Sequence, residues 1–141
     1  MKRLISLVLV ITALLGCMTC LALAETEIAP YNSSYFTSYG TTLSKAGDGR
    51  IKIVFQACAT RVASSIGVAT YQVEKLNSNG EWVDCTGLRS GATASNVGSY
   101  TFSKYFNGVA GETYRVKAVF TCTINGSNET KSYTSGRITA K

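Results

Sequence analysis

The sequence predicts an all-β protein, a two-layer antiparallel β-sandwich of the immunoglobulin or fibronectin III type with about seven strands. Three observations support this fold class. From residue 35 onward, polar and apolar residues alternate with a period of two, turn-forming residues recur at short intervals, and no segment has apolar residues at helical spacing. A chain of 141 residues, 45% of them hydrophobic, is long enough to bury one such core.

The first residues are predicted to direct export rather than to belong to the fold. Lys2 and Arg3 precede an apolar run over residues 4–15, and Ala22-Leu23-Ala24 forms a small-x-small cleavage site. The apolar run is shorter than the roughly 20 residues that a helix needs to cross a bilayer. We therefore expect a secreted, extracellular protein. Its expected parts are a signal peptide over residues 1–24, a flexible segment over 25–34 and a β-sandwich domain over 35–141.

A second interpretation of the same segment remains open. The run Leu14-Leu15-Gly16-Cys17 resembles a bacterial lipobox, in which the cysteine becomes the lipid-bearing first residue of a protein anchored at the cell surface. The residue before the glycine of a lipobox is usually smaller than leucine, and the site before Glu25 fits ordinary cleavage better. Contact with a membrane is therefore expected only if Cys17 carries a lipid.

Turn signals divide the domain into its expected strands. The first strand ends at Lys45-Ala46-Gly47-Asp48-Gly49, and the third and fourth are joined by the tight hairpin sequence Asn77-Ser78-Asn79-Gly80. Asn107-Gly108 and Asn125-Gly126 mark later turns, and residues 86–96, rich in glycine and serine, are the least constrained segment. The expected strands are 35–43, 50–60, 66–76, 81–85, 98–106, 113–123 and 130–140.

Two of these segments show which side faces the core. Apolar residues alternate with polar ones such as Lys52 over residues 50–60, and with polar ones such as Arg115 over residues 113–123. This alternation is typical of a strand with one buried face. The predicted inward residues are Ile51, Ile53, Phe55 and Ala57 in the first segment and Tyr114, Val116, Ala118 and Phe120 in the second.

Tyr114 is predicted to have a structural role. The run Gly111-Glu112-Thr113-Tyr114-Arg115-Val116 resembles the corner before the sixth strand of an immunoglobulin fold. In that corner a tyrosine hydroxyl bonds back to the main chain a few residues upstream. We therefore interpret Tyr114 as a tyrosine corner.

A wider resemblance covers most of the sequence after the signal peptide. It rests on the run from Tyr39 to Phe55, followed by Ala59-Thr60, Ile66-Gly67, Tyr71-x-Val-Glu74 and Gly80-x-Trp82. These motifs resemble a family of small secreted proteins from Clostridia and related Gram-positive bacteria, the domain of unknown function 6147. The resemblance implies a secreted bacterial β-sandwich with no established activity, and it assigns no functional residue. The three cysteines of the domain depart from the family pattern.

The cysteines permit one disulfide bond. Cys58, Cys85 and Cys122 remain after cleavage, so one bridge would leave one thiol free. Cys58 and Cys122 end the two strands that an immunoglobulin domain bridges between its sheets, and this is the leading pairing. The alternation argues against it, because Cys122 shares the inward face of Tyr114, whereas Cys58 faces outward unless a bulge intervenes. A bridge to Cys85, or no bridge, stays open.

The residues that carry most enzyme chemistry are few. The chain has no histidine, and three cysteines on separate strands do not make a closed zinc site. Most carboxylates lie at turns or on solvent faces, and Glu74 is expected to pair with Lys75 in its hairpin. No phosphate-binding loop, EF-hand or serine-hydrolase motif is present. We therefore expect neither an enzyme nor a cofactor or metal.

Charge and aromatic residues indicate the kind of partner. The net charge of +6 falls to +4 when Lys2 and Arg3 are removed with the signal peptide. The remaining cationic residues are scattered, which argues against nucleic acid as a partner. Tyr35, Tyr39 and Trp82 are the candidate ligand contacts, because exposed aromatic rings stack on sugars or anchor proteins. The alternative is that these rings only cover the edge of a small core.

The function expected from the sequence is a secreted, non-catalytic module that binds a cell-surface, cell-wall or host component, such as a cell-wall glycan or a surface protein. Two other hypotheses stay open. One is a secreted effector, either an antimicrobial protein or an enzyme inhibitor, and the other is a surface protein anchored through Cys17.

Overall fold

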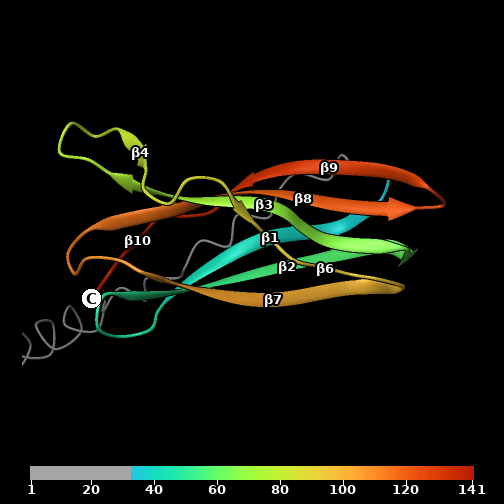
Figure 1. The fold of residues 1–141 in the computed structure, drawn as a ribbon, viewed down its shortest axis with the longest axis horizontal. Coiled ribbons are helices and arrows are strands. Elements are labelled where there is room, and N and C mark those ends of the chain that lie inside the picture. Colours follow the sequence, from blue (N-terminus) through green and yellow to red (C-terminus); the bar gives the residue numbers. More distant parts are fainter. Residues whose placement is uncertain (1–32) are drawn as a thin grey trace, which may run out of the picture.

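Two antiparallel sheets packed face to face make up the described part of the computed structural model, residues 33–141, which contains no helix (Figure 1). The predicted all-β sandwich is therefore confirmed. The expected signal peptide, Cys17 and residues 25–32 lie outside the described residues.

The strands are β1 (Phe36–Lys45), β2 (Arg50–Ala63), β3 (Ser65–Leu76), β4 (Trp82–Asp84), β5 (Arg89–Ser90), β6 (Thr93–Ala94), β7 (Val97–Asn107), β8 (Thr113–Ile124), β9 (Ser127–Thr134) and β10 (Ile138–Thr139).

The three-stranded sheet has the order β1-β2-β7, with β2 at its centre. Phe55 of β2 lies opposite Thr41 of β1 and Phe102 of β7. The turn between β1 and β2 contains Gly47 and Gly49, whose φ angles are +80° and +73°. Glycine adopts such angles without a steric penalty, which explains why the glycine-rich turn signal falls at this position.

The seven-stranded sheet is built around β3 and β8, which pair from Ser65 opposite Thr123 to Lys75 opposite Tyr114. Its main path is β10-β8-β3-β4. In addition, β9 pairs with β8, and the short strands β5 and β6 pair with β3. The sheet therefore has two long central strands and short segments along one border (Figure 1).

The expected strand 130–140 is corrected by the structure, which has two strands, β9 and β10, in its place. Both pair with β8, and Ser135 lies between them. The Ser135 Oγ accepts a hydrogen bond from the Val116 N–H at 2.9 Å, and the Ser135 N–H donates to the Val116 carbonyl at 2.8 Å. A side chain that bonds to the main chain interrupts the regular strand ladder, so one predicted strand becomes two.

Residues 86–96 are more ordered than expected, because β5 and β6 pair with β3 within this segment. Gly91 lies between the two short strands, and a Cβ at this position would collide with the Val68 carbonyl oxygen. The glycine therefore permits the close approach of two main chains. A glycine-rich composition taken by itself indicates a flexible segment. In this segment Gly91 instead allows the main chain to pack closely against β3.

The core lies between the sheets and follows the predicted faces. All eight residues predicted to point inward from the segments 50–60 and 113–123 are buried. Aromatic rings fill much of the space: Phe55 packs against Tyr71 at 5.1 Å and Phe102 at 4.9 Å between ring centroids. Period-two alternation therefore identified the buried faces of β2 and β8 correctly.

Candidate binding face

Polar and charged side chains gather on the outer face of the seven-stranded sheet. Val73, which lies between Gln72 and Glu74 on β3, is buried in the core, so alternation turns these two side chains outward. The same argument places Arg115 and Lys117 of β8 on the outer face. Glu74 lies opposite Arg115, and Gln72 lies opposite Lys117. The register of the two central strands thus brings one carboxylate next to two cations.

Glu74 is only 5% exposed, although it is an acid. Its carboxylate accepts a hydrogen bond from Arg115 Nε at 2.7 Å, and Lys117 Nζ lies 2.9 Å away. Gln72 Nε2 donates a further bond at 3.3 Å. Burial by itself would raise the pKa of Glu74, but the hydrogen bonds and charges of Lys117 and Arg115 outweigh it and hold the pKa below its ordinary value of 4.5. The carboxylate is therefore held ionised and in a fixed position.

The expected pairing of Glu74 with Lys75 is wrong. Lys75 Nζ instead lies 3.6 Å from a carboxylate oxygen of Glu112. Consecutive residues of a strand point to opposite faces, so Glu74 and Lys75 cannot meet across β3. The charged partners of Glu74 come from the neighbouring strand β8, and they could be found only by knowing which strand pairs with β3.

Trp82 lies at the margin of the same cluster. The Arg115 guanidinium lies over the indole ring, 4.3 Å from its centroid, so this cation contacts both Trp82 and Glu74. The hairpin before Trp82 is fixed by Asn77, whose Oδ1 accepts the N–H groups of Asn79 and Glu81 at 2.9 and 2.8 Å. Trp82 is half-buried, and the hairpin and the contact with Arg115 together hold it in place.

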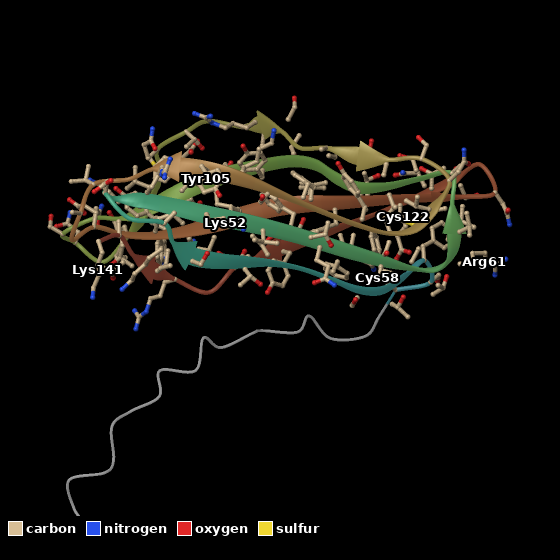
Figure 2. The ribbon with its side chains drawn as sticks, turned by 90° about the horizontal axis from the view of Figure 1, so that it is seen from below. Lys52, Cys58, Arg61, Tyr105, Cys122 and Lys141 are labelled. Carbon is tan, nitrogen blue, oxygen red and sulfur yellow. The ribbon has the colours of Figure 1, made fainter. Side chains whose placement is uncertain are left out.

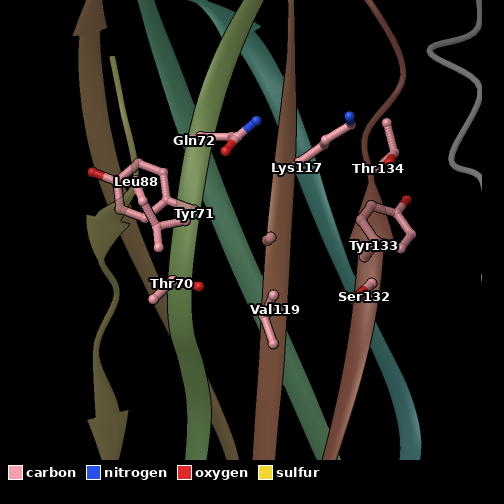
Figure 3. A pocket seen from close by; sticks show the side chains of 10 residues that line it. Thr70, Tyr71, Gln72, Leu88, Lys117, Val119, Ser132, Tyr133 and Thr134 are labelled. Atoms are coloured by element: carbon pink, nitrogen blue, oxygen red, sulfur yellow. The ribbon is translucent and has the colours of Figure 1, made fainter. Parts of the chain in front are cut away.

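A groove of about 290 Å³ lies next to this cluster on the same face and shares Gln72 and Lys117 with it (Figure 3). Leu88, from the segment between β4 and β5, forms one wall and is 71% exposed. The aliphatic hydroxyl groups of the groove come from β3 and β9, namely Thr70, Ser132 and Thr134. None of these three hydroxyls has a hydrogen-bond partner within residues 33–141. The groove therefore combines available hydroxyls with one apolar wall.

The three aromatic residues predicted as ligand contacts do not come together. Tyr39 lies among core rings, with centroid distances of 5.2 Å to Phe36 and 5.4 Å to Phe120, and it is only partly exposed. Tyr35 also packs partly against the core, and its N–H donates to the Glu129 carboxylate at 2.9 Å. Of the three, Trp82 alone lies beside the outer-face cluster. For Tyr35 and Tyr39 the geometry matches the alternative that they cover the edge of the core.

Tyr114 lies at the start of β8 and is 3% exposed. Its hydroxyl accepts a hydrogen bond from the N–H of Val109, five residues upstream, at 2.9 Å. The ring packs against Phe106 with a centroid distance of 5.1 Å. This contact ties the loop between β7 and β8 to the core and places Tyr114 away from the groove.

The Cys58–Cys122 bridge is not formed, because all three described cysteines are free thiols. Cys58 follows the buried Ala57 on β2 and faces outward, whereas Cys122 is fully buried between the sheets (Figure 2). The register of β2 with β7 is regular up to Cys58, so no bulge turns this side chain inward. Burial raises the pKa of Cys122, and it likewise raises the pKa of Cys85, whose thiol donates to the Val73 carbonyl at 3.1 Å.

Residues 33–141 lack two further features. They contain no group of three or more Cys, Asp or Glu side chains placed to hold a metal ion. They also contain no helix long and apolar enough to cross a membrane.

Sequence reasoning missed the cluster around Glu74 and the hydroxyl groove. The alternation of β8 already turned Arg115 and Lys117 outward, which was a usable signal. The missing information was the pairing of β3 with β8 and of β8 with β9, because those pairs place the side chains of three strands side by side.

No family model and no curated protein matches the chain. Among solved structures, a protein from Archaeoglobus fulgidus is similar to it, with 20% sequence identity over 75% of this chain and 98% of that chain, at a TM-score of 0.38. This similarity is too low to support a conclusion about function. The resemblance to the domain of unknown function 6147 stays a prediction.

Proposed function

We propose that the protein is an exported, non-catalytic binding module and that its ligand is a hydroxyl-rich glycan of a cell surface or cell wall. The observation that carries this proposal is the groove on the seven-stranded sheet, with three aliphatic hydroxyls that have no hydrogen-bond partner within residues 33–141 and the exposed wall of Leu88. A sugar offers hydroxyl groups and apolar C–H surfaces together. Binding sites of this kind combine a few placed polar groups with apolar contact.

The cluster beside the groove supports the proposal because contacts within the cluster already hold its side chains in place. Gln72 and Lys117 line the groove and are both bonded to Glu74, which Arg115 also holds. Side chains fixed in advance lose little conformational entropy when a ligand arrives. The ionised Glu74 therefore acts as a support for its neighbours rather than as a contact for the ligand.

Binding is favoured over glycan hydrolysis by the state of Glu74. A general acid of a glycosidase needs a raised pKa so that it keeps its proton near neutral pH. The pKa of Glu74 is lowered, and Arg115 and Lys117 occupy its carboxylate oxygens. This carboxyl group is therefore unsuited to donating a proton.

The test is a pull-down of the purified protein on insoluble cell-wall glycan, with binding isotherms for wild type and two variants. Leu88→Ala removes the wall of the groove, and we expect it to weaken binding by about tenfold, or about 1.4 kcal/mol. The matched control is Val62→Ala, because Val62 is an aliphatic residue of β2 with a similar exposure of 66%. Absence of wild-type binding would remove the proposal, as would equal binding by both variants and the wild type.

A further inference from the structure

Strand β7 is an open edge of the three-stranded sheet. It pairs with β2 from Ser99 to Asn107, and no strand within residues 33–141 pairs with its other side (Figure 1). In an antiparallel strand, successive residues direct their N–H and C=O groups to alternate edges. About half of the residues of β7 therefore present main-chain donors and acceptors to the outside.

Two other borders of the sandwich, β1 and β9, carry features that discourage strand pairing. β1 has a register irregularity between Phe36 and Ser38, and β9 carries the ion pair of Glu129 and Lys131. Irregularities and charges of this kind discourage an additional strand from pairing. From Ser99 to Asn107, β7 has a regular register with β2, no proline and a single charged residue, Lys104. A long, regular edge with few charges is a template for another strand.

The side chains of β7 add a row of aromatic rings. Tyr100, Phe102 and Phe106 are packed against the core but remain partly exposed at its border. The rings of Tyr100 and Phe102 stack with centroids 5.4 Å apart, and Phe102 stacks on Phe55 at 4.9 Å. A strand that joined this edge would cover rings that the fold leaves half open.

We propose that β7 pairs with β7 of a second copy of the chain, antiparallel about a two-fold axis, so that the two three-stranded sheets become one continuous sheet. Residues that lie opposite each other in an antiparallel pair point to the same face of the sheet. In a pair of identical strands related by a two-fold axis, this condition places one residue directly opposite the same residue of the second copy. Ser103 is the residue that fits. Tyr100 then lies opposite Phe106 of the second copy, and Phe102 lies opposite its Lys104.

This register explains why the second copy is the occupant. Aromatic pairs across strands and a lysine over an aromatic ring are both favourable. A pairing centred on Lys104 would set two like charges opposite each other, which is unfavourable. A pairing centred on Phe102 would set Phe106 against Gly98, which has no side chain to contact. The Ser103 register alone gives each ring a partner and keeps the two lysines apart.

The test uses the full chain and two lysine variants on the outer face of β7, where Ser103 and Thr101 are both exposed. Ser103→Lys places two lysines directly opposite each other. We expect the association constant of the dimer, measured by sedimentation equilibrium, to fall at least tenfold. Thr101→Lys adds the same charge two residues away, opposite Tyr105 of the second copy, and should leave the dimer intact. Thermal unfolding of each variant tests whether the monomer remains folded.

A cross-linking experiment fixes the register. Cysteines at Ser103 in the two copies would lie within the Cα separation of about 4.4–6.8 Å that a disulfide needs, so Ser103→Cys should form a covalent dimer on mild oxidation. Thr101→Cys is the control and should show only the background of the native cysteines, since the two copies of residue 101 lie four positions out of register. A wild type that stays monomeric at its highest soluble concentration would overturn the proposal. So would a dimer that Ser103→Lys leaves intact, or equal cross-linking of the two cysteine variants.

Discussion

The two sheets of the sandwich differ in how their charges are arranged. On the seven-stranded sheet, Glu74 is nearly buried and lies between Arg115 and Lys117. The strands of the three-stranded sheet contain no acidic residue, and Lys52 and Tyr105 lie on its open outer face (Figure 2). The cationic residues of its strands are Lys45, Arg50, Lys52, Arg61 and Lys104.

This difference shows that polar side chains are held in a fixed geometry on the outer face of the seven-stranded sheet. A buried charge is tolerated only if partners neutralise it, so Glu74 and its neighbours must keep one arrangement. Solvated cations with no acidic partner carry no such constraint. We therefore assign ligand binding to the outer face of the seven-stranded sheet, and we assign self-association to the open edge of the other sheet.

The largest expected effects should not distinguish the sheets, because their inner faces share one core. Phe55 of β2 and Phe120 of β8 are both fully buried. Phe55→Ala and Phe120→Ala should each reduce the free energy of unfolding by about 3–5 kcal/mol, through lost burial and the cavity left behind. Urea denaturation measures both values. A cost below about 1 kcal/mol for only one of them would mean that the sheets do not share the core equally.

A smaller effect should separate the outer faces. Glu74→Ala removes the shared partner of Arg115 and Lys117 and should cost about 1–3 kcal/mol, as expected for hydrogen bonds to charged groups. Gln56→Ala is the matched change on the outer face of β2, where the side chain is exposed and has no hydrogen bond within residues 33–141. It should change stability by less than about 0.5 kcal/mol. Equal losses of unfolding free energy for the two variants would contradict the proposed difference between the outer faces.

The smallest expected effect is the pH dependence of the stabilisation that Glu74 provides. Because the pKa of Glu74 is lowered in the folded state, its stabilisation is present above the ordinary value of 4.5 and is lost as pH falls through the folded-state pKa. The difference in unfolding free energy between wild type and Glu74→Ala should therefore be constant near neutral pH and shrink below about pH 4.5.

Glu129, whose pKa is also lowered, titrates in the same acidic range in both proteins, so its contribution cancels in that comparison. Burial opposes its ionisation, and bonds from Lys131, Tyr35 and Ser33 outweigh the burial. A series of urea titrations from neutral to acidic pH measures the remaining difference. If it grew toward low pH, the assigned charge state of Glu74 would be incorrect.

The sequence predicted the fold through signals that act within one strand. Alternation gave the buried faces of β2 and β8, and Asn-Gly marked the turn between β8 and β9, where both residues have positive φ. What failed depends on contacts between segments far apart in the chain. Ser135 interrupts a strand by bonding to Val116, and the charged partners of Glu74 lie on β8 rather than in its own hairpin. Neither can be derived without knowing which strands pair.

The candidate site was less predictable than the fold for the same reason. Of the predicted ligand contacts, Trp82 lies beside the cluster around Glu74, whereas Tyr39 packs among core rings. The groove needs β3, β8 and β9 side by side, and β9 was predicted with the wrong limits. A site that spans three strands becomes visible only when their registers are known.

The most direct test of the binding face is amide chemical-shift mapping during titration with soluble cell-wall glycan fragments. The account predicts saturable shifts that cluster at Thr70 and Gln72 of β3 and at Ser132 of β9, together with Leu88. The exposed residues Gln56 and Thr101 on the other sheet should not shift. Shifts centred on the three-stranded sheet, or no shifts at saturating glycan, would contradict the assignment of ligand binding to the seven-stranded face.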